Sequence, residues 1–283
     1  MDKSVGKDEQ EKRATFLKGL CCHMVSITGD AVVVGQFSQQ PQFFTYAGFV
    51  VSIRHQWLLV TAGHILKELD DGLKNKLLRL QRCELVDYYG LNAKSDIGIP
   101  FDFANATKLY WDDDKLGLDI GLVQIEPHYR RLMETNGVTA IAQDNWRLHE
   151  QLDFEWFGVL GLPDELLVRD RRIAPSGGTI AGGMRPVLMV GDQIEAFSDE
   201  KPTPISPWLA IKLRDKDEIK SLKGMSGGPI FGFFRSDKKL LYTTVAVQSW
   251  WDKKRRIAFG TSLPPVMDLF ESALDSRVAE ASG

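Results

Sequence analysis

The sequence predicts an all-β protein built of two packed six-stranded antiparallel β-barrels, followed by a C-terminal helix. Short runs rich in Val, Ile, Phe and Thr lie between residues 21 and 265, with turn residues between them. They form two sets, separated near residues 126–150. Closing each set into a barrel would protect strand edges that would otherwise be exposed. After the last run, Pro264 and Pro265 open an amphipathic segment typical of a helix.

The first barrel is expected over residues 21–145, after a polar N-terminal extension at residues 1–20. Its strands are predicted at "HMVSI", "AVVVGQF", "FFTYAGFVVSI", "WLLVTAGHIL" and "KLYWDDDKLGLDIGLVQI". The leucines of "HILKELDDGLKNKLLRL" recur at helical spacing, which predicts a helical insertion near residues 65–80. The segment "PHYRRLMETNG" is expected to connect the two barrels as a helix or loop.

The second barrel and the C-terminal helix are expected over residues 146–283. The predicted strands are "FEWFGVLGLP", "PVLMVGDQIEAF", "WLAIKL", "GGPIFGFF", "LLYTTVAVQSWW" and "RIAFGTSL". A basic run at residues 253–256 separates the last two, where a hairpin turn with solvated charges is the simplest interpretation. In the final helix, Val266, Leu269, Phe270 and Leu274 are expected to form one apolar stripe.

Composition excludes several classes of protein. The net charge of -3 gives no basic footprint, so nucleic-acid binding is not expected. No window of bilayer-spanning length is free of charge, and the charged N-terminus lacks the apolar core of a secretory leader, which favours a cytoplasmic protein without membrane contact. Three cysteines, two of them adjacent, do not form a disulfide framework, and "CCHM" lacks a second ligand pair for a metal. No metal and no cofactor are therefore expected.

Three residues are candidates for a catalytic role. Ser226 lies in "LKGMSGGPIF" among glycines that would let a substrate carbonyl approach the backbone; a plain Gly-Ser turn is the alternative. His64 follows the strand "WLLV" at a helix start, where the backbone alone could satisfy it. Asp119 lies inside an apolar strand, so its carboxylate needs a donor, either an imidazole or a backbone turn.

These residues occur in the order His64, Asp119, Ser226, within "TAGH", "DIGL" and "GMSGGP". The three motifs resemble, one by one, the histidine, aspartate and serine motifs of the trypsin/chymotrypsin family of serine proteases, especially its bacterial and stress-protease branches. "FGVLGLP" resembles the entry to the family's second barrel, and "VAVQSW" its strand along the substrate cleft. The resemblance covers roughly residues 21–265 and implies a chymotrypsin-like double barrel.

The resemblance also implies a serine endopeptidase acting on a protein or peptide. Ser226 would attack the carbonyl, His64 would move the proton, and Asp119 would orient the imidazole. The backbone N–H groups of Gly224 and Ser226 would bind the oxyanion. Ser249 and Trp250 would line the substrate cleft.

Three positions depart from the family pattern. Met225 stands where most members have an aspartate that pairs with a newly cut N-terminus, so the enzyme is either simply active or ordered by a regulatory protein partner. By the resemblance Lys220 occupies the position at the base of the primary pocket, but it lies in a charged loop and is more readily interpreted as solvated than as a selector of substrate. Trp251 replaces a frequent glycine and would narrow that pocket.

Two other functions compete with proteolysis. A catalytically weak or inactive homologue could keep the cleft as a protein-binding module, and Met225 and Trp251 keep that alternative open. "GMSGG" also fits the serine motif of an esterase-like hydrolase, but no histidine follows Ser226, so the required order cannot occur. The other histidines, His23, His55, His128 and His149, match no family motif and are interpreted as surface or satisfied residues.

Overall fold

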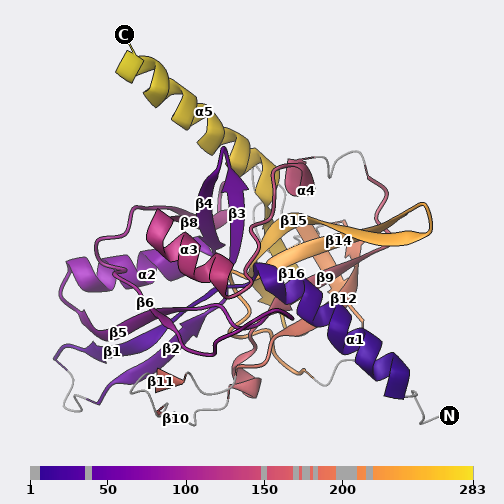
Figure 1. The fold of residues 1–283 in the computed structure, drawn as a ribbon, viewed down its shortest axis with the longest axis horizontal. Helices are drawn as coiled ribbons and strands as arrows, with labels where there is room; N and C mark the ends of the chain where they lie inside the picture. The colour runs from indigo at the N-terminus through magenta and orange to yellow at the C-terminus, as the bar shows by residue number, and fades with distance from the viewer. Residues whose placement is uncertain are drawn as a thin grey trace.

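The computed structural model describes residues 7–35, 40–147, 152–167, 172–173, 179–180, 184–195, 209–214 and 219–282. Two β units lie side by side, with the N-terminal unit in indigo to magenta and the C-terminal unit in orange to yellow (Figure 1). The all-β class with a C-terminal helix is confirmed.

The N-terminal unit consists of two four-stranded sheets rather than one six-stranded barrel. The sheet orders are β2-β1-β5-β6 and β3-β4-β8-β7. The chain passes from one sheet to the other at a corner between β2 and β3, where Gly48 has no room for a Cβ, because Val60 O would lie 2.8 Å from it. The bounds are β1 Ser26–Val33, β2 Gln42–Tyr46, β3 Phe49–Ile53, β4 Gln56–Thr61, β5 Leu78–Val86, β6 Ile99–Pro100, β7 Lys108–Asp113 and β8 Leu118–Ile125.

The C-terminal unit is the closed six-stranded barrel that the sequence predicted. Its strands follow the order β12-β13-β16-β15-β14-β9. The basic run at residues 253–256 is the turn between β15 and β16, as predicted. The bounds are β9 Trp156–Gly161, β12 Val187–Ile194, β13 Leu209–Leu213, β14 Pro229–Ser236, β15 Lys239–Asp252 and β16 Ile257–Ser262, with a separate pair β10 Arg172–Ile173 and β11 Thr179–Ile180.

The predicted helical insertion is shorter than expected. Helix α2 (Gly63–Lys74) ends before Leu77 and Leu78, and Leu78 begins β5 instead. Lys76 adopts a φ of 58°, which a helix cannot continue through, and the Leu78 side chain packs against Gly72, where a Cβ would lie 2.4 Å away. The helical spacing of the leucines therefore extends beyond the end of α2 and into the strand that follows.

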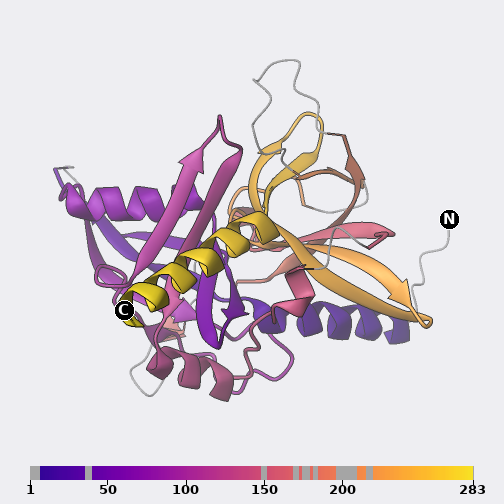
Figure 2. The ribbon, with the colours of Figure 1, turned by 90° about the horizontal axis from the view of Figure 1, so that it is seen from above.

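Helices lie at both ends and between the units. Helix α1 (Lys7–Leu20), although first in the sequence, lies alongside the C-terminal unit (Figure 2). Its Phe16 ring packs on Phe233 of that unit. The connector forms α3 (Pro127–Thr135) and the short α4 (Asp144–Arg147). Helix α5 (Leu263–Ser282) projects from the body of the molecule (Figure 1). None of the helices within the described ranges is long and apolar enough to cross a bilayer.

One apolar cluster joins the two units. It contains buried side chains of β3 and β4, such as Phe49 and Leu58, together with Leu160, Phe231 and Val247 of the barrel. Burial of apolar area at roughly 25 cal/mol per Å² makes such a shared core the main force that holds two units in one orientation. The start of α5 belongs to the same cluster through Leu263, Val266, Met267 and Phe270, whereas Leu269 of the predicted stripe is 59% exposed and Leu274 lies where side chains are not described.

Candidate active site

His64 lies in the first turn of α2, directly after β4. The preceding Gly63 allows the helix to begin against β7, since a Cβ there would lie 1.8 Å from Trp111 O. This close contact explains the glycine of the motif "TAGH": a residue with a Cβ at position 63 would clash with β7 and displace the start of the helix. The imidazole is consequently presented at the edge of the sheet, with 39% of its side chain exposed.

Asp119 lies at the start of β8, beside the start of α2. Its carboxylate accepts two hydrogen bonds from one residue: Oδ1 from the backbone N–H of His64 at 2.9 Å, and Oδ2 from the His64 ring at Nδ1, 2.7 Å away. The carboxylate therefore binds the first turn of the helix and orients the ring at once. Because an ionised carboxylate only accepts, Nδ1 carries a proton and Nε2 is the basic nitrogen.

The electrostatic surroundings of His64 favour its protonated form. Burial lowers its pKa, but the hydrogen bond that the ring donates to Asp119 and the negative charges of Asp119, Asp112 and Glu68 together raise the pKa above the ordinary 6.5. A proton taken up at Nε2 is thus stabilised by neighbouring carboxylates. This is the property that a general base needs at the moment it accepts a proton.

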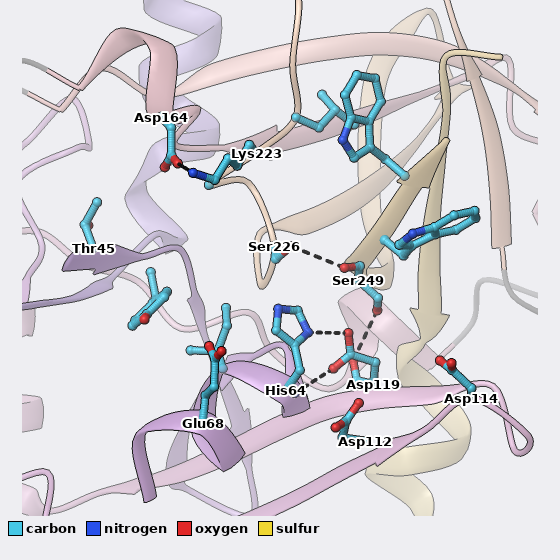
Figure 3. Close-up of a pocket in the computed structure, with 16 residues that line it drawn as sticks. Thr45, His64, Glu68, Asp112, Asp114, Asp119, Asp164, Lys223, Ser226 and Ser249 are labelled. Atoms are coloured by element: carbon cyan, nitrogen blue, oxygen red, sulfur yellow. Dashed lines mark hydrogen bonds and ion pairs between the residues drawn. The ribbon is translucent and has the colours of Figure 1, made fainter. Parts of the chain in front are cut away.

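Ser226 lies in a tight loop before β14. Gly227 has a φ of +89°, and a Cβ there would meet Thr61 Oγ1 at 2.2 Å. At Gly228 a Cβ would lie 2.0 Å from Leu160 O. Glycine is required at both positions because the backbone of the loop packs closely against both units. The Ser226 hydroxyl donates to the carbonyl of Ser249 at 3.2 Å, and it faces the same pocket as the His64 ring (Figure 3).

The backbone amides around Ser226 differ in their hydrogen bonding. Met225 N–H points inward and donates to Leu222 O at 2.9 Å. The flanking amides of Gly224 and Ser226 have no protein acceptor among the described residues. Met225 itself is fully buried in the barrel core and packs against Gly161. A buried apolar side chain thus occupies the position at which most members of the family that the sequence resembles have an aspartate.

Side chains of the barrel hold the backbone of Asp119. Its N–H donates to Thr261 Oγ1 at 2.9 Å, and the Ser249 hydroxyl donates to its carbonyl at 3.1 Å. Ser249 and Thr261 also lie 3.3 Å apart, oxygen to oxygen. The residues from the two units are therefore connected by direct hydrogen bonds, and their relative placement does not depend on apolar packing alone.

A pocket of about 680 Å³ lies between the units and contains all three predicted residues. Carboxylates dominate its charged lining: they outnumber the single lysine, Lys223, which pairs with Asp164 at 3.1 Å. Figure 3 shows these side chains around the cavity. The lining residues are Thr45, Tyr46, His64, Ile65, Glu68, Asp112, Asp114, Asp119, Asp164, Leu222, Lys223, Gly224, Ser226, Ser249, Trp250 and Trp251.

The residues predicted to bind substrate lie in different places. Ser249, Trp250 and Trp251 line the pocket on the β15 side. Trp251 packs partly buried against the barrel core, and Trp250 is 41% exposed and contacts the Phe259 ring at a tilt of 31°. Lys220 is exposed and outside the pocket lining, which agrees with the solvated interpretation of this residue.

Sequence reasoning missed Thr261, Asp164 and Glu68. Thr261 contacts the site only because β16 pairs beside β15, and Asp164 only because the loop of Ser226 folds back onto the entry to the barrel. Neither carries a local motif. Glu68 lies one helical turn after His64, so helical spacing alone could have indicated it.

The remaining histidines are far from these residues or outside the described ranges. His23 is buried and lies between Thr139 O, 2.6 Å from Nδ1, and Tyr242 Oη, 2.8 Å from Nε2. His55 lies in an exposed turn, and His128 pairs with a neighbouring glutamate on the surface. His149 lies outside the described residues. Within the part of the chain that is described, no group of three or more His, Cys, Asp and Glu side chains could hold a metal ion.

The solved structures that are similar to this chain include two serine proteases. One is a thermostable serine protease, AL20, from an extremophilic microorganism, with 14% identity over 86% of this chain and 91% of that chain, and a TM-score of 0.48. The other is the serine protease domain of the Sesbania mosaic virus polyprotein, with 13% identity over 85% of this chain and 88% of that chain, and a TM-score of 0.43. No family model and no curated protein matches the sequence.

Proposed function

We propose that this protein is a serine endopeptidase that hydrolyses peptide bonds through His64, Asp119 and Ser226. The observation that carries the proposal is one pocket with three features. An imidazole is oriented by a carboxylate at 2.7 Å, a serine followed by two glycines faces the same cavity, and the backbone amides of Gly224 and Ser226 have no acceptor among the described residues. These are the parts that acyl transfer needs: a base, a nucleophile and donors for developing negative charge.

The proposed reaction proceeds in two halves. Ser226 Oγ attacks the carbonyl carbon of the scissile bond while His64 Nε2 takes its proton, and the amides of Gly224 and Ser226 bind the oxyanion. His64 then gives the proton to the leaving amine, which departs and leaves an acyl group on Ser226. Water, deprotonated by His64, attacks the acyl-enzyme, and the carboxylic acid is released as Ser226 regains its proton.

The serine hydroxyl must reorient before this reaction. In this structure it donates to Ser249 O, 3.2 Å away. Rotation about χ1 between staggered positions moves a serine hydroxyl without moving the backbone. Hydrogen bonds between a nucleophile and its base are often long or misaligned until substrate binds. The resting hydrogen bond is therefore compatible with the proposed reaction.

A fluorophosphonate probe tests the proposal directly. This class of reagent phosphonylates a serine only when a base and oxyanion donors activate it, so wild-type protein should be labelled. Ser226→Ala and chemically denatured protein should not be labelled. Ser272→Ala is the matched control, since Ser272 lies on α5 away from the pocket, and it should be labelled like wild type. Mass spectrometry of the labelled peptide should place the adduct on Ser226.

The competing proposal is a protein-binding module that keeps the cleft without catalysis. The hydroxyl of Ser226 donating to Ser249 rather than to His64 is the observation in its favour. Absence of labelling of the folded wild-type protein, both alone and with cell lysate added, would support the binding module and refute the endopeptidase. Equal labelling rates with and without lysate would argue against ordering by a partner.

A further inference from the structure

A short turn at the entry to the barrel contacts the loop that carries Ser226. The turn, Asp164–Leu166, is a single 3₁₀ turn after Pro163. The backbone N–H of Asp164 donates to Lys223 O at 2.8 Å, and its carboxylate pairs with the Lys223 ammonium at 3.1 Å. Glu165 Oε1 accepts the backbone N–H of Lys220 at 2.7 Å. The turn therefore holds the loop at two points three residues apart.

The contact is close enough to require a glycine. At Gly224 a Cβ would lie 2.7 Å from Leu162 O, 2.8 Å from the nitrogen of Asp164 and 2.2 Å from its Oδ1. One residue later, Met225 packs against Gly161, where a Cβ would meet it at 2.9 Å. The loop thus lies directly on the segment from Gly161 to Glu165, with no space between them.

The hydrogen bond to Lys223 O determines the direction of the Gly224 amide. In a planar trans peptide the C=O and the following N–H point in opposite directions. Because Asp164 N–H binds the Lys223 carbonyl, the Gly224 N–H points away from the turn and is left to the pocket that Gly224 lines. Rotation of this one peptide would turn a carbonyl toward the oxyanion instead, and glycine permits such rotation more readily than other residues.

We propose that Asp164 and Glu165 are positioning residues that hold the Lys223–Gly224 peptide with its N–H toward the oxyanion. This inference rests on the proposed function. Asp164 acts chiefly through its backbone N–H, because the ion pair with Lys223 is exposed, with 82% of the lysine side chain accessible. Glu165 fixes the start of the loop through a charged acceptor, which makes the stronger kind of hydrogen bond.

Comparing two substitutions at one position isolates the backbone N–H. Asp164→Ala removes the ion pair and keeps the N–H, whereas Asp164→Pro removes both. Proline fits the site locally, since Asp164 is the first residue of the turn and Pro163 before it is already extended, with ψ of 133°. Asp164→Ala should keep fluorophosphonate labelling within about threefold of wild type. Asp164→Pro should slow it at least tenfold, within the range of 10²–10³ for loss of one oxyanion donor.

Kinetics with a peptide ester separate positioning from general damage. Asp164→Pro should lower kcat and leave KM unchanged, because the oxyanion forms only in the transition state. The midpoint of the pH profile, which reports His64, should not move. Asp192→Ala is the matched control: it breaks another exposed ion pair of the barrel, with Arg214 at 2.6 Å, outside the pocket lining, and it should change neither parameter.

Glu165 provides a second test that does not depend on how well the proline variant folds. Glu165→Ala should slow labelling several-fold, and Glu165→Gln, which keeps an acceptor oxygen, should recover most of the rate. Labelling of Asp164→Pro as fast as Asp164→Ala, or equal labelling of the two Glu165 variants, would overturn the positioning role while the endopeptidase stands. A wild-type protein that never reacts would overturn both.

Discussion

A methyl group at Gly224 should slow acylation strongly while the fold survives. In Gly224→Ala the new Cβ must avoid Leu162 O at 2.7 Å, whereas ordinary van der Waals contact begins at 3.4 Å. The loop must therefore move by about 0.7 Å, since Leu162 O belongs to the backbone of the barrel entry. Displacements near 1 Å at a reacting centre cost on the order of 10²-fold in rate. We expect acylation to fall about 10- to 100-fold.

Gly35 provides a control for the backbone strain in this substitution. Its φ of +87° matches the +89° of Gly224, but no heavy atom of the described residues lies within 4 Å of a Cβ built there. Gly35→Ala and Gly224→Ala should both lose about 1–2 kcal/mol of stability from the left-handed conformation. Only Gly224→Ala has to move the loop, and only it should lose acylation rate.

The assay is the second-order rate of fluorophosphonate labelling, measured beside the free energy of unfolding in denaturant. The informative quantity is the rate of Gly224→Ala relative to Gly35→Ala. If both variants react at the wild-type rate, the Gly224 amide contributes nothing to the reaction and the reasoning fails. If both lose rate equally, strain and not position is responsible.

Three further changes test other parts of the structure. In the proposed reaction neutral His64 is the base, and its pKa is raised, so the labelling rate should rise with pH through a midpoint above 6.5, and Glu68→Gln should lower that midpoint in a pH–rate titration. Met225→Ala should cost about 2–5 kcal/mol in denaturant unfolding, whereas exposed Leu269→Ala should change little. Burial lowers the pKa of His23, so stability should decline as pH falls below 6.5, where the unfolded chain gains a proton first; His23→Gln should flatten that decline in pH-dependent melting.

Much of the fold could be predicted from local sequence, and the predictions that were wrong have identifiable physical causes. The strands of the C-terminal barrel coincide with β-branched and aromatic runs between turn residues, because those runs are long enough to show alternation. The division of the N-terminal unit into two sheets was not predictable, since it depends on the corner at Gly48 and on which strands pair across it. The end of α2 was misplaced because Leu77 and Leu78 continue the helical spacing by chance.

The candidate site divides in the same way. His64, Asp119 and Ser226 could be selected because each lies in a short motif whose neighbours are constrained by close packing, as Gly63 and Gly227 show. The residues that hold these three in place could not be selected from local sequence. Thr261 and the turn at Asp164 reach the site through strand pairing and loop folding between distant segments, which no local pattern records.

The hydrogen bonds between the backbone of Asp119 and the side chains of Ser249 and Thr261 have a consequence for tolerance to mutation. They connect the two units at the candidate site, so a substitution deep in the shared apolar cluster that tilts one unit by a small angle would misalign His64 and Ser226 without altering either residue. Variants that lose turnover yet keep their secondary structure should therefore be sought in that cluster as well as around the pocket.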